Sequence, residues 1–332
     1  MTKKKSFVVY VGRENNIHDK LFVEVLEKEY FVIQRYTENV PDLIFDGKAF
    51  ENCNLIIAGP LTDALSVIPD QISIPILGIS HGFDLNLESS NTKLKKNIRR
   101  CSNIIADCDH IVEILRNNYQ YTNEIYKMPF GCDYDYFSHV IPAFSNTPLI
   151  LVTRNWFQVH SNQVIIAALE ILLEKEIELN CTFIGDGPLL TPAIKEISKR
   201  DQSSKINFLG TMSKKDIRDE MMDQWLYISA AESDGTSISL LEAMSAGMIC
   251  LVSDFPSNLE WIRHGYNGYI FRTNNPVHLS ELIQEISSLS VAEMKIIGDR
   301  ARQTARLRGN WLVNSETLLN ASRKILSIGN GD

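Results

Sequence analysis

The segment ESDGTSISLLEAMSAG, residues 232–247, places two acidic side chains around a turn of small and hydroxyl residues. Asp234 precedes Gly235, Thr236 and Ser237, and Glu242 follows in a stretch with the apolar spacing of a helix. Free backbone amides and the positive end of a helix bind anions, and the hydroxyls add hydrogen-bond donors. The segment therefore suits the binding of a diphosphate.

The same residues also fit a purely structural role. Ser239 and Glu242 have the spacing of a capping box, in which the Glu side chain satisfies an amide at the helix start. Gly235, Thr236 and Ser237 fit an ordinary helix N-cap. From these residues alone, the ligand site and the capped helix both stay open.

The composition is that of a globular protein rather than a nucleic-acid-binding or membrane-spanning one. The chain has 332 residues, 44% hydrophobic and 22% charged, with a formal net charge of −8 and a pI near 5.5. An acidic chain lacks the basic surface of a general nucleic-acid binder, and no apolar run approaches the ~20 residues of a membrane span. The basic start, Met1 to Lys5, is not followed by the apolar region of a signal peptide. The six cysteines form no Cys-x-x-Cys pair, so we expect reduced core residues in a cytoplasmic protein and no zinc site.

The order of elements predicts two successive series of strands and helices. Expected strands of the first series are 6–12, 31–37, 54–60, 74–82 and 103–108, with helices at 19–29, 92–101 and 110–119. After a linker at 138–147, strands are expected at 148–154, 180–187, 206–210, 225–230 and 248–254, with helices at 162–176, 190–200 and 310–328. Two such series imply two doubly wound parallel sheets, with a ligand site beyond the carboxyl ends of the strands, in the cleft between the sheets.

The order of motifs resembles that of the family-4 retaining glycosyltransferases, which have the α/β GT-B fold of two facing Rossmann-like domains. Asp234, seven residues and Glu242 match the spacing of the family signature, and EAMSAG matches the residues that follow it. MPFGCDYDYF (128–137), FIGDGP (183–188), NFLGTMSKKDI (207–217) and SNLEWIRHGYNGYIF (257–271) resemble further family segments. The resemblance implies an acceptor-side domain at 1–140 and a nucleotide-sugar domain at 147–332 that includes the C-terminal helix.

The resemblance also assigns roles to single residues. It implies that Arg154 holds the donor diphosphate, that Glu242 accepts from the ribose hydroxyls and that Asp234 contacts the donor sugar. His81, at the end of a strand, matches the family residue near the reacting carbon, although a satisfied loop histidine is the structural alternative. The implied catalytic set is His81, Asp234 and Arg154, and the implied donor-binding set is Arg154, Gly185, Met212, Gly235, Thr236, Ser237, Ile238 and Glu242. Gly12 and Arg13, after the first strand, are expected on the acceptor side.

Two positions depart from the family pattern. Asp234 stands where most members carry Glu, and Glu232 has the wrong spacing to replace it. The Lys expected about five residues after Arg154 is absent, and Val159 and His160 occupy that neighbourhood. A surface position is the alternative for His160. These departures bear on the donor sugar and on the phosphate site.

Three other features have plain explanations. The Asp-Tyr-Asp at 133–135 is like a metal motif of another glycosyltransferase fold but lies inside a family segment, so no metal is expected. The Gly-Asp-Gly at 185–187 lacks the third glycine of a dinucleotide fingerprint. The basic run Lys93, Lys95, Lys96, Arg99 and Arg100 fits a solvated helix face, with contact to an anionic membrane surface as the alternative.

The sequence thus predicts a retaining, metal-independent glycosyltransferase of bacterial polysaccharide or glycoconjugate synthesis. It would move a sugar from a nucleoside-diphosphate donor, UDP favoured and GDP the alternative, to a hydroxyl of a saccharide or lipid-linked acceptor. No cofactor and no nucleic-acid partner are expected, and the place of action would be the cytoplasm or the inner face of the membrane. A GT-B nucleotide-sugar epimerase and a catalytically silent glycosyltransferase-like subunit are the alternatives.

Overall fold

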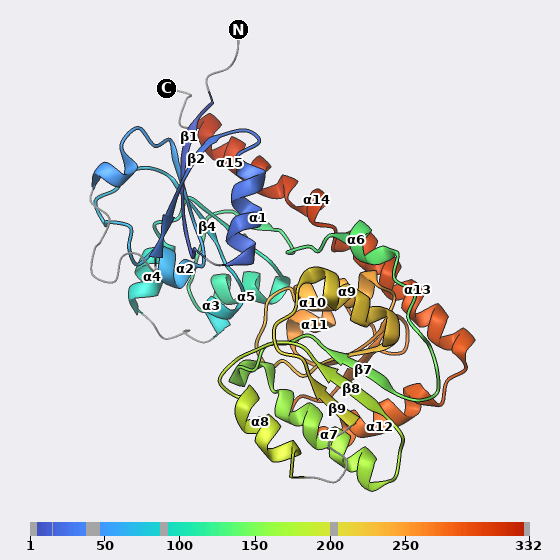
Figure 1. Cartoon of the computed structure of the whole chain (residues 1–332). Coiled ribbons are helices and arrows are strands. Elements are labelled where there is room, and N and C mark those ends of the chain that lie inside the picture. The colour runs from blue at the N-terminus through green and yellow to red at the C-terminus, as the bar shows by residue number, and fades with distance from the viewer. Residues whose placement is uncertain (1–4, 15, 38–46, 87–91, 200–204, 329–332) are drawn as a thin grey trace. The chain divides into compact units, whose positions relative to one another are not determined.

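The computed structural model describes residues 5–14, 16–37, 47–86, 92–199 and 205–328 (Figure 1). The chain divides into two compact units. The first unit comprises Met1–Phe130 and Leu312–Asp332, and the second comprises Gly131–Trp311. Each unit is built on its own parallel sheet, so each is described by itself.

The first unit contains a six-stranded parallel sheet in the order β2-β1-β3-β4-β5-β6. The strands are β1 (Phe7–Gly12), β2 (Phe31–Tyr36), β3 (Leu55–Ala58), β4 (Ile76–Ile79), β5 (Asn103–Ala106) and β6 (Ile125–Lys127). The helices are α1 (Ile17–Leu26), α2 (Leu61–Ala64), α3 (Phe83–Asn86), α4 (Thr92–Ile98) and α5 (Asp109–Asn117). The strand order reverses between β1 and β3, and such a reversal opens a crevice at the carboxyl ends of the strands.

The second unit has the 3-2-1-4-5-6 strand order of a dinucleotide-binding fold. Its order is β12-β11-β10-β7-β8-β9, with β7 (Leu149–Val152), β8 (Asn180–Phe183), β9 (Ile206–Phe208), β10 (Leu226–Ser229), β11 (Ile249–Ser253) and β12 (Tyr269–Phe271). The helices are α6 (Tyr134–Ser138), α7 (Asn162–Glu174), α8 (Leu190–Ile197), α9 (Lys214–Asp223), α10 (Ile238–Ser245), α11 (Pro256–Leu259), α12 (Pro276–Ser287) and α13 (Val291–Arg308). The reversal of strand order falls between β7 and β10.

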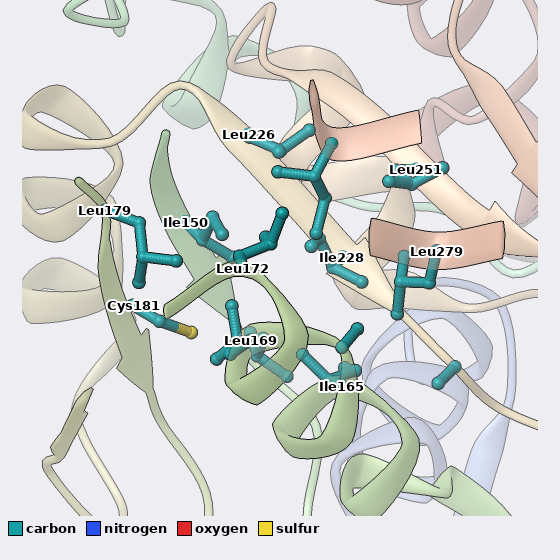
Figure 2. Packing of buried hydrophobic residues seen from close by; sticks show 14 of the residues in the cluster. Ile150, Ile165, Leu169, Leu172, Leu179, Cys181, Leu226, Ile228, Leu251 and Leu279 are labelled. Atoms are coloured by element: carbon teal, nitrogen blue, oxygen red, sulfur yellow. The ribbon is translucent and has the colours of Figure 1, made fainter. Parts of the chain in front are cut away.

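Alternate residues of the second sheet pack on opposite faces, as the two-residue repeat of a strand requires. On one face, Ile150, Ile228 and Leu251 pack against the apolar sides of α7 and α12 (Figure 2). On the other face, residues such as Leu151 and Tyr227 pack against α10 and α13. Burial on both faces explains the nearly continuous apolar runs that predicted these strands.

The C-terminal helix belongs to the first unit, which corrects the predicted assignment to the second domain. The segment forms α14 (Trp311–Asn314) and α15 (Glu316–Ile328), and Figure 1 shows the red α15 beside the blue α1. The apolar face of α15, with Leu318 fully buried, covers the first unit, and Lys324 donates to Glu124 over 2.8 Å. The apolar spacing of residues 310–328 predicted a helix but carried no information about which sheet it would cover.

The boundary between the units also differs from the predicted one. The second unit begins at Gly131, whereas the sequence predicted a start at residue 147 after a linker at 138–147. Within that segment Val140 is 3% exposed and belongs to the core of the second unit with Phe137 of α6. The segment predicted as a linker therefore contains a buried residue of the second unit's core.

Several elements had no predicted counterpart, and the cysteines behave as expected. The prediction omitted β6 and the helices α9, α12 and α13, and named the segment of β12 only as part of a family motif. All six cysteines are free, and all but Cys53 are buried. Within the described ranges, no helix has the length and apolar character needed to cross a membrane.

We expect Leu318→Ala to destabilise the first unit by about 2–5 kcal/mol, because it removes buried methyl groups and leaves a cavity. Hydrogen exchange should accelerate in β1 and β3, and the amides of β7 and β10 should keep their protection. The matched control is Ile328→Ala on the same helix, where the side chain is 73% exposed. Faster hydrogen exchange confined to the amides of β7 and β10 would show that α15 packs on the second unit instead.

Candidate active site

Arg154 lies at the carboxyl end of β7, where the strand order of the second sheet reverses. The backbone of Gly185, just after β8, passes directly beside it. A Cβ added to Gly185 would lie 2.8 Å from the carbonyl oxygen of Arg154, and the residue has a φ of +134°. Only glycine tolerates this approach and this backbone, so Gly185 fixes the loop that carries Arg154.

The guanidinium of Arg154 connects three parts of the second unit. Its Nη2 donates to Oδ2 of Asp234 over 2.7 Å, and its Nη1 donates to Oγ of Ser237 over 2.9 Å and of Ser239 over 3.2 Å. Tyr227 of β10 shares a hydrogen bond of 3.0 Å with Ser239. The Arg154 and Asp234 side chains are only 10% and 20% exposed. Arg154, which follows β7, is thereby brought together with Asp234, Ser237 and Ser239 of the 232–247 segment.

Helix α10 begins directly at this network. Ser237 is its N-cap and accepts a hydrogen bond from the amide of Leu240 over 3.4 Å. Asp234 Oδ1 accepts from the amide of Gly235 over 3.0 Å, and Thr236 and Ser237 are nearly buried. The helix-cap alternative is therefore realised at Ser237, and the cap residue is also a partner of the arginine.

The capping-box interpretation of Ser239 and Glu242 is wrong. The cap is Ser237, so Glu242 lies too far along the helix to reach the first amides. Among the described residues, the Glu242 carboxyl makes no hydrogen bond. Burial raises the pKa of Glu242 to about 7, and the Lys214 ammonium opposes that shift. A partly buried acid without a structural partner is a candidate for ligand binding.

Lys214 of α9 is a cation that the sequence reasoning missed. Its ammonium donates to Asp133 over 3.1 Å and lies 4.6 Å from the centre of the Tyr136 ring. Asp133 is the N-cap of α6, so the first acid of the Asp-Tyr-Asp motif has a structural role. Across the described residues, no group of three or more His, Cys, Asp and Glu side chains is placed to hold a metal ion.

His160 does not replace the missing family lysine as a cation. Its Nδ1 lies 2.7 Å from the carbonyl oxygen of Asn155. Burial and the nearby charge of Arg154 lower the pKa of His160 to about 4, so the ring is neutral at neutral pH. Glu232 is likewise engaged elsewhere, because it accepts a hydrogen bond from Ser161.

The two apolar residues of the candidate donor set line the same region. Met212 precedes α9, and Ile238 is the first residue of α10. Both are partly buried and pack against the core behind α10. They can offer apolar surface without hydrogen bonds of their side chains.

In the first unit, Gly12 is the last residue of β1 and Arg13 follows it, at the reversal of strand order. The amide of Arg13 donates to Asp19 Oδ2 over 2.6 Å, and a Cβ on Gly12 would lie 2.7 Å from the same oxygen. The Arg13 guanidinium donates through Nε to Asp63 over 2.7 Å. Arg13 thus joins the loops that follow β1 and β3, and its charge is paired within the unit.

His81 follows β4 and is held in a buried polar cluster. Its Nε2 lies 3.4 Å from Oδ1 of Asp19, and it is 5% exposed. Burial, followed by the charges of His18 and Arg13, keeps the pKa of His81 well below its usual value. The ring is therefore neutral near pH 7.

The backbone at His81 is fixed by Asp84, which the sequence reasoning also missed. Asp84 Oδ1 accepts from the hydroxyl of Ser80 over 2.9 Å and from the amide of His81 over 3.2 Å. Its Oδ2 accepts from the amide of Leu61 over 2.7 Å. Burial raises the pKa of Asp84 to about 6. The spacing of Ser80 and Asp84 in the sequence could have indicated this hydrogen bond.

The basic run on and after α4 has partners within the first unit. Lys96 donates to Asp70 over 2.5 Å, and Arg100 donates to the carbonyl of Ile68 over 3.1 Å. Arg99 donates to Gln120 over 3.3 Å. Lys93 is exposed and Lys95 is half-buried. Contact of this run with a membrane stays a prediction.

Two parallel six-stranded sheets, each with a reversal of strand order, define a GT-B type α/β protein. The chain belongs to the family described as glycosyl transferases group 1, whose model matches residues 137–304, just over half of the chain. The N-acetyl-alpha-D-glucosaminyl L-malate synthase of Bacillus anthracis is 23% identical over 246 residues. That match covers 70% of this chain and 63% of the relative's own length.

Solved glycosyltransferase structures share the fold over nearly the whole chain. A glycosyltransferase from Rickettsia africae superposes with a TM-score of 0.77 at 18% identity, covering 97% of this chain and 99% of that one. Anabaena Alr3699/HepE in complex with UDP and glucose gives 0.76 at 14% identity, covering 96% and 100%. Sucrose-phosphate synthase from Thermosynechococcus elongatus gives 0.79 at 12% identity, covering 98% and 100%. The predicted fold class is confirmed.

The raised pKa of Glu242 predicts a specific pH dependence of stability. Because the folded pKa exceeds the unfolded one, the folded state binds the proton more tightly, and stability falls as pH rises from about 4.5 to 7. In ligand-free protein, Glu242→Gln should therefore be more stable than the wild type by about 2–3 kcal/mol at about pH 8. At about pH 4.5 the two proteins should be equally stable.

Urea denaturation at the two pH values measures this difference. Glu293→Gln is the control, because that exposed acid is hydrogen-bonded in a capping box and its pKa is lowered. The control should be less stable than the wild type at the higher pH. Equal stability of Glu242→Gln and the wild type at both pH values would contradict a buried, unpartnered carboxyl.

Proposed function

We propose that this protein is a retaining, metal-independent glycosyltransferase that uses a nucleoside-diphosphate sugar. The observation that carries the proposal is the network of Arg154, Asp234 and Ser237 at the start of α10, with the unpartnered Glu242 one turn further on. The network offers a cation and a helix N-terminus to a diphosphate, and Glu242 offers two acceptor oxygens to vicinal hydroxyls.

The donor diphosphate would bind where Arg154 now contacts Asp234. A phosphate accepts hydrogen bonds from a guanidinium in the same forked geometry as a carboxylate. The diphosphate therefore competes with Asp234 for Arg154, and a displaced Asp234 can accept from hydroxyls of the donor sugar. Gly235, Thr236 and Ser237 would supply further donors, and Gly185, Met212 and Ile238 would surround the nucleotide.

In the proposed reaction the bond between the anomeric carbon and the phosphate oxygen breaks, and the acceptor oxygen bonds to the same face of that carbon. The acceptor hydroxyl gives its proton to the departing phosphate oxygen. Arg154 and the helix end stabilise the negative charge that develops on the leaving group. The neutral His81 ring would contact the donor sugar near the reacting carbon, and Gly12 and Arg13 would lie on the acceptor side.

UDP is the favoured nucleotide, with GDP the alternative. Anabaena Alr3699/HepE was solved with UDP-glucose, and the pneumococcal O-GlcNAc transferase GtfA was solved with UDP and GlcNAc. A hydroxyl of a saccharide or of a lipid-linked saccharide is the proposed acceptor. The proposed place of action is the cytoplasm or the inner membrane surface, in bacterial polysaccharide or glycoconjugate synthesis.

Nucleotide binding is tested by thermal shift with UDP, GDP, ADP, CMP and NAD. A nucleotide at 100 times its dissociation constant should add ~2.7 kcal/mol of stability. We expect stabilisation by UDP, which should be lost in Arg154→Ala and smaller than in the wild type in Glu242→Gln. Arg306→Gln, an exposed arginine of α13, is the control and should respond like the wild type. Stabilisation by NAD alone would refute the proposal, and no response to any nucleotide would favour the silent subunit.

Glu242 also predicts how UDP affinity depends on pH. The acceptor role requires the ionised carboxyl, so with a pKa of about 7 the dissociation constant should rise about tenfold between pH ~8 and ~6. Calorimetry on the wild type and on Glu242→Gln measures this change. The titration of UDP itself is common to both proteins, so only the wild type should show the additional tenfold change.

Turnover distinguishes transfer from epimerisation. We expect consumption of a UDP-sugar to require an acceptor, and proton NMR of the first product should show the same anomeric configuration as the donor. EDTA should leave the rate unchanged. Interconversion of the donor without acceptor would establish the epimerase instead, and an inverted product would refute retention.

A further inference from the structure

A pocket of about 430 Å³ lies in the second unit, outside the Arg154 network. Its walls are the segment that follows α11 and the C-terminal half of α13. None of its lining residues belongs to the candidate donor site or to the core of the proposed mechanism. The pocket is therefore unexplained by glycosyl transfer.

Three guanidinium groups surround this pocket, and each lies over an aromatic ring. Arg300 lies 4.4 Å and Arg263 5.4 Å from the centre of the Tyr266 ring. Arg308 lies 4.8 Å from the centre of the Trp261 ring. Cation–π contact with the rings favours these positions of the guanidinium groups, while Arg263 and Arg308 stay exposed to solvent.

The charges at the pocket are not balanced within the described residues. Glu260 is the single carboxylate in the pocket wall, against Arg263, Arg300 and Arg308. Arg308 donates to the backbone carbonyl of Glu260. Neither Arg263 nor Arg300 forms an ion pair with a carboxylate of the described chain. An anion in the pocket would supply the negative charge that Arg263 and Arg300 lack there.

We propose that this pocket binds a phosphate-bearing ligand. Several guanidiniums that approach from two elements suit a phosphate group, whose three oxygens accept forked hydrogen bonds from different directions. A concentration of positive charge in a chain of net charge −8 also concentrates an anionic ligand locally. The ligand is distinct from the nucleotide, because the lining residues are distinct.

The phosphate could come from a lipid headgroup or from a soluble phosphate compound. The rim of the pocket includes Leu259, 49% exposed, and Leu307, 72% exposed. Apolar side chains beside basic ones are typical of a membrane-surface contact. A soluble phosphate would contact the arginines and leave these leucines exposed to water. A lipid headgroup would bring the leucines into contact with the membrane, so only a lipid ligand predicts binding to vesicles.

Two probes test the proposal, inorganic pyrophosphate and phosphatidylglycerol vesicles. Pyrophosphate is titrated by calorimetry into the full-length protein with saturating UDP present, and the experiment is repeated without UDP. Vesicles of phosphatidylcholine with and without phosphatidylglycerol are sedimented with the protein. The test variant is Arg263→Gln/Arg300→Gln. The control is Arg306→Gln, which removes an exposed charge of α13 that does not line the pocket.

We expect the double variant to bind at least one probe about tenfold more weakly than the control, since charge-assisted contacts are lost. Weaker pyrophosphate binding alone identifies a soluble ligand. Weaker vesicle sedimentation, with or without a change for pyrophosphate, identifies a lipid headgroup. Equal binding of both probes by the double variant and the control overturns the proposal.

Two further measurements keep the test independent of folding and of the donor site. Arg263→Lys/Arg300→Lys keeps the positive charges but removes the forked hydrogen-bond donors of the guanidinium groups. This variant should bind the probe to which the wild type binds with an affinity between those of the control and the glutamine variant. If the glutamine variant does not fold, equal binding by the lysine variant and the control overturns the proposal. An unchanged thermal response to UDP in the variants shows that the donor site is intact. If the wild type bound neither UDP nor GDP, the proposed function would be refuted and the proposal for this pocket would be unaffected.

Discussion

The buried guanidinium of Arg154 is the contact on which the candidate site depends. It joins the end of β7 to the loop after β10 and to the first turn of α10. Without it, Asp234 would be a partly buried carboxylate lacking its cation, which is costly. The reversal of strand order between β7 and β10 opens a crevice at the carboxyl ends of these strands. Gly185 lets the loop after β8 approach the backbone of Arg154 closely.

The site retains polar groups that a purely structural region would satisfy. Among the described residues, Arg154 Nε is buried without a hydrogen-bond partner, and burial raises the pKa of Glu242 by more than the charge of Lys214 lowers it. Both features lower the stability of the empty protein. They are understandable if a ligand supplies the missing partners, since active sites commonly sacrifice stability for binding.

The sequence predicted the fold class and most strands because parallel strands buried on both faces read as apolar runs. The family resemblance also assigned Arg154, Asp234 and Ser237 to one site, and the fold brings them together because residues after neighbouring strands of one sheet meet at the same edge. Prediction from the sequence failed where tertiary packing decides. The spacing of 310–328 could not show which sheet the helix covers, and Lys214 acts through contacts that no local pattern contains. The capping box failed because the helix starts two residues earlier, at Ser237.

The absent family lysine shifts the balance of charge at the phosphate site. His160 stands near that position, but its ring is neutral at neutral pH because Arg154 and burial lower its pKa. A diphosphate would then face one guanidinium and the helix end. Asp234 is already bonded to that guanidinium, so under the proposed function its carboxylate would have to move as the diphosphate binds. The acid at position 234 reaches Arg154 in this structure, and under the proposed function it would turn toward the donor sugar when the diphosphate binds.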